Sequence, residues 1–311
     1  MSTLHALVAL LGLAACSGEP AAAPAPAAHP LDVRALSFPA AWLVQRVAGD
    51  AVTLTNVNPP GEDPPAWQPS GDLVADLGNA DLIVANGAGY EAWVTTVSLP
   101  ASKLLNLADG QDLITLPGVT HSHGKDGSHS HAGVDPHTWA DPALFAKQAA
   151  ALHDQLVALD PGHKATFDDG LARVQADLAA LDQELAAALV GAKGHRLASS
   201  HPAFNYLARR YGLDVTSFEF DPSEAPEAAA KATFDAWTAT AGAGPVLLWE
   251  AAPADAARAA FSADVRQTVL DPLEQPSADG SYDYLAKSRT NVAVFTGLFP
   301  SNGASPGPAT P

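Results

Sequence analysis

The chain has 311 residues, which is enough for one large domain or two of medium size. Its 16 Lys and Arg against 34 Asp and Glu give a net charge of −18, which repels phosphate backbones and argues against nucleic acid as a partner. Hydrophobic residues make up 47% of the chain, so it can bury a substantial core and is not disordered as a whole. A single cysteine excludes an intrachain disulfide and a cysteine-rich metal site.

The N-terminal residues are predicted to export the chain. Residues 1–15 contain an apolar run of signal-peptide length that ends in Leu-Ala-Ala before Cys16. This ending resembles a bacterial lipoprotein box, so we expect a lipoprotein signal peptide at 1–15 and lipidation of Cys16; the alternative is an ordinary signal peptide with an incidental cysteine. No Lys or Arg precedes the run, so the usual positive region is missing. Residues 16–30 are expected to be an Ala/Pro tether and 300–311 a disordered tail.

The body begins with alternating strands and helices. Strands are predicted at 33–37, 52–57 and 82–85, and helices at 40–47, 73–77 and 90–97. Such alternation is typical of a parallel sheet covered by helices. We expect an N-terminal α/β lobe over 31–160, whose last part is a helix at 142–159.

A long helix follows this lobe. Its apolar residues recur at spacings of three and four and form one stripe, which consists of Phe167, Leu171, Val174, Leu178, Leu181, Leu185 and Leu189. A stripe of this kind is typical of a helix that lies across a domain core. We assign residues 161–192 to a helix that links two lobes.

Alternation resumes in the last third of the chain. Strands are predicted at 196–199, 215–220, 245–250 and 265–270, and helices at 203–211, 225–239, 254–261 and 283–298. We expect a C-terminal α/β lobe over 193–299. The predicted fold class is therefore α/β, with two lobes, each a mostly parallel sheet with flanking helices, joined by a long helix.

The 11 histidines are unevenly distributed. Four of them lie in a Gly- and Ser-rich loop at 120–132, and they are His121, His123, His129 and His131. Imidazole is a preferred ligand of Zn²⁺, so this loop is predicted to be a weak, multidentate metal trap. The alternative is a merely solvated polar loop.

Three further residues form a candidate metal site. His201 and Asp271 each follow a predicted strand, and His137 lies just beyond the histidine-rich loop. Ligands of open α/β sheets bind outside the carboxyl ends of strands, so these side chains are expected to face one crevice. Two imidazoles and a carboxylate suit Zn²⁺ or Mn²⁺. Taken singly, each histidine is more often structural, and Asp271 is equally compatible with a cap or turn.

Four motifs carry a resemblance to a known family. They are Ala-Asp-Leu-Ile-Val-Ala-Asn-Gly at 80–87, Asp-Pro-His-Thr-Trp-Ala-Asp-Pro at 135–142, Ser-His-Pro-Ala-Phe-Asn-Tyr at 200–206 and Leu-Asp-Pro at 270–272. With these motifs in order, the chain resembles the zinc/manganese solute-binding proteins of bacterial ABC metal importers (cluster A-I). The histidine-rich loop is more similar to the zinc-specific branch than to the manganese branch.

The resemblance implies two lobes joined by a rigid helix with a metal cleft between them. It implies that His137, His201 and Asp271 are metal ligands, that the ion is Zn²⁺ in preference to Mn²⁺, and that an ABC transporter permease receives it. The protein is then a monomeric receptor and no enzyme, anchored by lipid at Cys16 in the periplasm or on the outer face of the membrane.

The sequence departs from the family at Pro65, where the family has a metal-binding histidine. Tetrahedral Zn²⁺ takes four ligands, so one must come from elsewhere. The candidates are a carboxylate of Glu62 or Asp63, a histidine of the 120–132 loop, or water; a degenerate site is the remaining alternative. Water or a loop histidine is favoured, because two consecutive prolines restrict the backbone beside Glu62.

Two other functions are compatible with the same residues. A periplasmic zinc buffer or chaperone without a transporter would use identical binding chemistry. A zinc-dependent hydrolase would use three protein ligands and a bound water. The hydrolase is disfavoured because the sequence has neither a His-Glu-x-x-His helix nor a Gly-x-Ser-x-Gly elbow.

Overall fold

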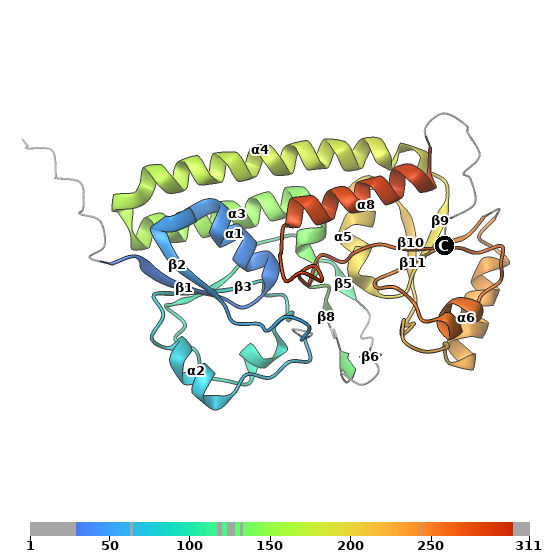
Figure 1. Cartoon of the computed structure of the whole chain (residues 1–311), viewed down its shortest axis with the longest axis horizontal. Coiled ribbons are helices and arrows are strands. Elements are labelled where there is room, and N and C mark those ends of the chain that lie inside the picture. Colours follow the sequence, from blue (N-terminus) through green and yellow to red (C-terminus); the bar gives the residue numbers. More distant parts are fainter. Residues whose placement is uncertain are drawn as a thin grey trace, which may run out of the picture.

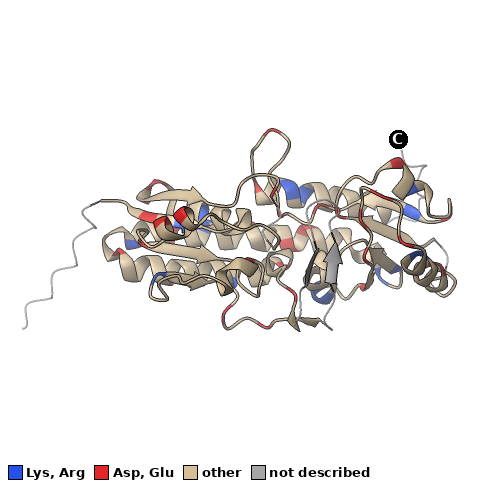
Figure 2. Cartoon of the chain, turned by 90° about the horizontal axis from the view of Figure 1, so that it is seen from below, with Lys and Arg blue, Asp and Glu red and all other residues tan. Residues whose placement is uncertain are grey.

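The structure is a computed structural model that describes residues 29–62, 65–116, 120–122, 128–130, 133–242 and 244–300. The described residues form two lobes side by side beneath a layer of long helices (Figure 1). Acidic residues are spread along both lobes (Figure 2), so the negative charge of the chain is not confined to one of them. No helix in the described ranges has the length and apolar character needed to cross a membrane.

The first lobe is built on a four-stranded parallel sheet in the order β2-β1-β3-β4. Its strands are β1 (Leu31–Ala35), β2 (Val52–Asn56), β3 (Leu82–Ala85) and β4 (Leu104–Asn106), and its connecting helices are α1 (Phe38–Ala48) and α2 (Gly71–Leu77). All four residues of β3 are buried, as expected for a parallel strand covered on both faces.

The second lobe repeats this arrangement with the strand order β10-β9-β11-β12, again all parallel. Its strands are β9 (Arg196–Ser199), β10 (Asp214–Ser217), β11 (Val246–Trp249) and β12 (Arg266–Val269), and its helices are α5 (Asn205–Tyr211), α6 (Ala228–Thr238) and α7 (Asp255–Ala259). Each sheet therefore carries the same order of strands along the chain.

Three helices form the layer above the lobes (Figure 1): α3 (Pro142–Leu159), α4 (Lys164–Ala188) and α8 (Tyr284–Leu298). The side chain of Asp141 caps the start of α3 by accepting hydrogen bonds from the backbone N–H groups of Ala143 and Leu144. Most of the predicted apolar stripe of α4 is buried, and α4 runs above both lobes (Figure 1). The predicted fold class is confirmed.

Shorter elements complete the fold. Two small antiparallel pairs join β5 (Thr115–Leu116) to β8 (Gly133–Val134) and β6 (Thr120–Ser122) to β7 (Ser128–Ser130). Short 3-10 turns occur at Gly49–Ala51, Ala92–Thr95, Thr138–Ala140, Pro161–His163, Val190–Ala192 and Pro202–Phe204. The helix expected at 90–97 is therefore only one 3-10 turn, and β4 was not predicted.

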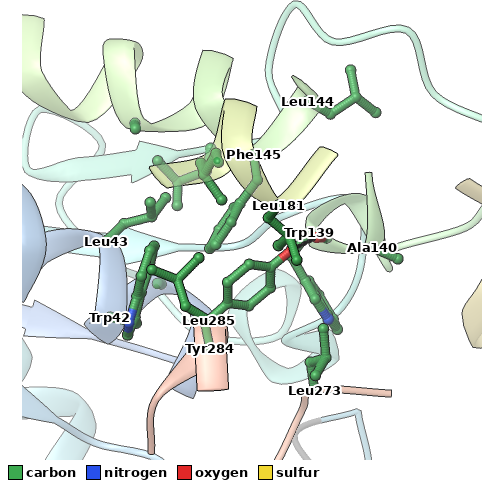
Figure 3. Close-up of a cluster of buried hydrophobic side chains, with 14 of the residues drawn as sticks. Trp42, Leu43, Trp139, Ala140, Leu144, Phe145, Leu181, Leu273, Tyr284 and Leu285 are labelled. Carbon is green, nitrogen blue, oxygen red and sulfur yellow. Dashed lines mark hydrogen bonds between the residues drawn. The ribbon is translucent and has the colours of Figure 1, made fainter. Parts of the chain in front are cut away.

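One hydrophobic core continues from the first lobe through the long helices into the second. Figure 3 shows its centre, where Trp42 of α1 and Phe145 of α3 surround Tyr284 of α8. The ring centroid of Tyr284 lies 4.6 Å from that of Phe145 and 5.2 Å from that of Trp42. The Tyr284 hydroxyl donates to the Trp139 carbonyl over 2.6 Å. The start of α8 is thus fixed against the first lobe.

We predict that Gly170→Ala destabilises the protein, because a Cβ there would collide with the backbone of Val47 where α4 packs on α1. Overpacking of this kind costs about 1–3 kcal/mol. The matched control is Gly297→Ala on α8, where a Cβ would meet no atom and the better helix propensity of alanine adds up to about 1 kcal/mol. Urea unfolding measures the free energy of unfolding of both variants. An equal change in this free energy for the two would contradict close packing of α4 on α1.

Candidate metal centre

His137 is held in a defined orientation by its neighbour Asp135. One carboxylate oxygen of Asp135 accepts a hydrogen bond from the His137 backbone N–H over 2.9 Å and lies 2.7 Å from the imidazole Nδ1. His137 is only 1% exposed and Asp135 is fully buried. The other ring nitrogen, Nε2, therefore faces the junction of the lobes.

The backbone around His137 is supported from inside the first lobe. The amide of Asn86 donates to the Pro136 carbonyl over 2.9 Å. The carboxylate of Glu91 in turn accepts the backbone N–H groups of Asn86 and Gly87, and burial raises the pKa of Glu91. The loop after β3 thus fixes the loop that carries His137.

His201 approaches from the second lobe. It follows β9 and precedes the 3-10 turn at Pro202–Phe204, so it lies at the carboxyl end of a parallel strand as predicted. Its ring centroid is 5.4 Å from that of His137, with the two ring planes at 88°. The Nδ1 atom of His201 lies 3.7 Å from a carboxylate oxygen of Glu250, so each imidazole has a carboxylate beside one ring nitrogen.

Glu274 has a carboxylate within reach of both histidines. One ligand atom each from His137, His201 and Glu274 lie within 4.8 Å of one another, and Nε2 of His137 is 3.0 Å from Oε1 of Glu274. The structure places the carboxylate of Asp271 2.5 Å from Nζ of Lys287 on α8. Of the three predicted ligands, the two histidines therefore come together, and the carboxylate that joins them in this group is that of Glu274, which the sequence analysis did not name.

The direction of Glu274 depends on a turn that the sequence does not reveal. Leu273 has a φ of +67°, a left-handed conformation that is uncommon for leucine. The carboxylate of Asp271 accepts the Leu273 backbone N–H over 2.7 Å, and the Tyr282 hydroxyl donates to the Leu273 carbonyl over 2.7 Å. The only sequence signal for Glu274 was a second carboxylate three residues after Asp271.

The site favours a positive charge. Burial by itself lowers the pKa of His137, but the carboxylates of Asp135 and Glu274 outweigh burial and raise that pKa to about 10. Two imidazoles and a carboxylate within reach of one point are a suitable donor set for a divalent transition metal, which takes ligand atoms at about 2.0–2.2 Å.

The other candidate ligands are placed differently. The Glu62 side chain is exposed, Pro65 is buried, and Asp63 lies outside the described residues. His121 and His129 are opposite each other in the backbone pairing of β6 and β7. His123 and His131 also lie outside the described residues, so the identity of the fourth ligand stays a prediction from the sequence. Cys16, the predicted lipidation site, lies outside them as well.

Comparison with known proteins gives a family match. The family model described as zinc-uptake complex component A, periplasmic, matches residues 33–297. The zinc-binding lipoprotein AdcA of Streptococcus pneumoniae is 30% identical over 283 residues, which cover 88% of this chain and 55% of that protein. This chain thus spans about half the length of that relative. The manganese ABC transporter substrate-binding lipoprotein PsaA of the same species is 31% identical over 227 residues, covering 68% of this chain and 69% of PsaA.

Solved structures agree with the fold. The Zn(II)-bound ZnuA-like domain of Streptococcus pneumoniae AdcA superposes with a TM-score of 0.72 at 26% identity, covering 86% of this chain and 97% of that domain. The metal-dependent lipoprotein YcdH of Bacillus subtilis also gives a TM-score of 0.72, at 23% identity, covering 85% of this chain and 97% of YcdH. The two-lobed architecture is therefore shared with both.

We predict that each Zn²⁺ that binds releases about one proton at pH 8. The His137 imidazole, with its pKa raised from 6.5 to about 10, is protonated at that pH and must lose its proton before it can bind a metal. Affinity should therefore keep rising with pH above 6.5 instead of levelling off there. Calorimetric titration at pH 8 in buffers of different ionisation enthalpy measures the release. No released proton would mean that the imidazole is neutral in the metal-free protein.

Proposed function

Since the chain belongs to the family of periplasmic zinc-uptake complex component A proteins, we propose that it is a monomeric extracytoplasmic receptor for Zn²⁺ that delivers the ion to an ABC importer permease. The observation that carries this proposal is the convergence of two buried imidazoles and one carboxylate, from distant parts of the chain, where the lobes meet. The relatives named as metal-binding lipoproteins support it.

In this proposal His137, His201 and Glu274 hold the ion, and water or a histidine of the 120–132 loop completes the tetrahedron. Glu274 takes the place predicted for Asp271, because the carboxylate of Asp271 pairs with Lys287. Two imidazoles favour Zn²⁺ over Mn²⁺, which prefers oxygen ligands.

The surroundings of the ligands support binding and not hydrolysis. A hydrolytic zinc needs a carboxylate or histidine beside its bound water to act as a general base. Here the carboxylates of Asp135 and Glu250 each lie beside a ring nitrogen of a ligand histidine. Such contacts orient imidazoles for metal binding, as is usual in zinc sites. We therefore propose a binding protein and no enzyme.

The ligand set is tested by a pair of neighbouring variants. We expect Glu274→Gln to weaken Zn²⁺ binding by about a hundredfold, because it removes one of the ligands that share a binding free energy of roughly 10–16 kcal/mol. Asp271→Asn is the matched control and should leave the affinity within about threefold, since it removes an ion pair and no ligand. Isothermal titration calorimetry with Zn²⁺ measures the affinity of both variants and of the unmodified protein.

His137→Ala and His201→Ala should each weaken binding at least as much as Glu274→Gln. If Asp271→Asn abolishes tight binding while Glu274→Gln does not, Asp271 is the ligand and the assignment of Glu274 is wrong. If the unmodified protein does not bind Zn²⁺ at all, the proposed function fails.

The proposed location depends on Cys16, which lies in the part of the sequence that resembles a lipoprotein signal. We expect Cys16→Ala to abolish incorporation of labelled fatty acid and to move the protein from the membrane fraction to the soluble one. His201→Ala, which alters the metal site alone, should keep both the label and the membrane fraction. Undiminished labelling of Cys16→Ala would rule out acylation at this position.

A further inference from the structure

The two lobes are joined next to the candidate metal site by the side-chain amide of Gln275. Its Nε2 donates to the Glu62 carbonyl over 2.8 Å, and its Oε1 accepts the Gly61 backbone N–H over 3.1 Å. The bonded residues are 213 and 214 positions apart in the chain. A single amide thus pairs with the backbone of the first lobe as a neighbouring strand would, through one donor and one acceptor.

The turn that Gln275 contacts is already formed within the first lobe. Asn58, which is 2% exposed, donates to the Glu62 carbonyl over 3.1 Å and to the Pro59 carbonyl over 3.3 Å. The Glu62 backbone N–H closes the turn on the Pro59 carbonyl over 3.3 Å. Gly61 adopts a φ of +83°, which glycine tolerates at little cost. Gln275 therefore meets a fixed partner.

The chain before Gln275 is fixed as well. The indole N–H of Trp139 donates to the Pro272 carbonyl over 2.9 Å, and the Tyr282 hydroxyl holds the Leu273 carbonyl. In Figure 1 this chain loops beneath the start of α8, between the lobes. Glu274 lies between these anchors and Gln275, so its backbone is held from both sides.

We propose that Gln275 is a positioning residue that keeps Glu274 against His137 and so sets how fast the metal ion leaves. The inference rests on the proposed function, because it assigns Gln275 a role at that metal site. When the amide of Gln275 separates from Gly61 and Glu62, the turn that carries Glu274 is held on one side only. Its carboxylate then swings away from the ion more often, and the ion is released.

The chemistry of this contact suits a reversible closure. Both hydrogen bonds join uncharged groups at a partly exposed position, where water can replace either partner. Breaking these two hydrogen bonds therefore leaves no charged group of Gln275 or of the Gly61 and Glu62 backbone without a partner. A partner that binds the turn at Gly61 and Glu62 would compete with Gln275 for the same backbone groups.

The test compares Gln275→Ala with Gln175→Ala, which makes the same chemical change at an exposed position on α4. Zn²⁺ is the probe, and its release is followed by stopped flow in excess chelator. Two neutral hydrogen bonds correspond to a change of about tenfold or more, so the dissociation rate of Gln275→Ala should rise about tenfold. The association rate should stay within about twofold, because Gln275 acts after the ion has arrived. Gln175→Ala should change neither rate.

A second measurement reports the contact without any metal. Hydrogen exchange at the Gly61 amide should be slow in the unmodified protein and fast in Gln275→Ala, while the unfolding midpoints of the two proteins stay within a few degrees. A general loss of stability would instead speed exchange throughout the lobe.

The outcomes separate the two proposals. If the unmodified protein binds Zn²⁺ and Gln275→Ala releases it at the unmodified rate, the role of Gln275 is refuted and the receptor function stands. If Gln275→Ala slows association as strongly as it speeds release, Gln275 shapes the site before binding, and the inference is also refuted. If Zn²⁺ does not bind the unmodified protein, the receptor function itself is overturned.

Discussion

The geometry of the site depends on one buried carboxylate. Asp135 contacts His137 through one oxygen, and its other oxygen accepts a hydrogen bond over 2.9 Å from Asn205, at the start of α5 in the second lobe. The Asp135 carbonyl also accepts the Tyr206 hydroxyl over 2.8 Å. Because Asp135 is fully buried, water does not compete for these bonds. The orientation of the His137 ring is thus fixed relative to the helix that begins just after His201.

The same carboxylates explain why the site favours a cation. Carboxylates flank both imidazoles, and around His137 their charge raises the pKa of the ring above its usual value. In the proposed site, the same local excess of negative charge stabilises a proton on His137 and would stabilise a divalent ion between the imidazoles. They compete for Nε2 of His137, so the charge that strengthens metal binding also makes it dependent on pH.

Much of the fold and the identity of the family could be predicted from the sequence. Hydrophobic runs and the apolar stripe of α4 gave the two-lobed α/β class, and the motifs around His137 and His201 gave the family that the match over 33–297 confirms. The short helix expected at 90–97 was wrong, since Glu91 turns inward to bind the backbone after β3. The position of the Glu274 carboxylate beside the two histidines could not be predicted, because it depends on the left-handed backbone of Leu273 and on the hydrogen bond from Tyr282. The local periodicity of hydrophobic residues does not indicate such contacts.

The continuous core limits how the proposed metal site can open. A wide hinge motion would separate Tyr284 from Trp42 and Phe145 and expose aromatic surface that is now buried, at a cost of roughly 25 cal/mol for each Å². Movement of residues 274–275 away from the first lobe breaks only a few hydrogen bonds between uncharged groups and the contact of Glu274 with His137. The smaller motion is therefore the less costly route to an open site. Since Asp135 still orients His137 after Glu274 has moved, that route would remove the proposed ligands one at a time, with the carboxylate of Glu274 first.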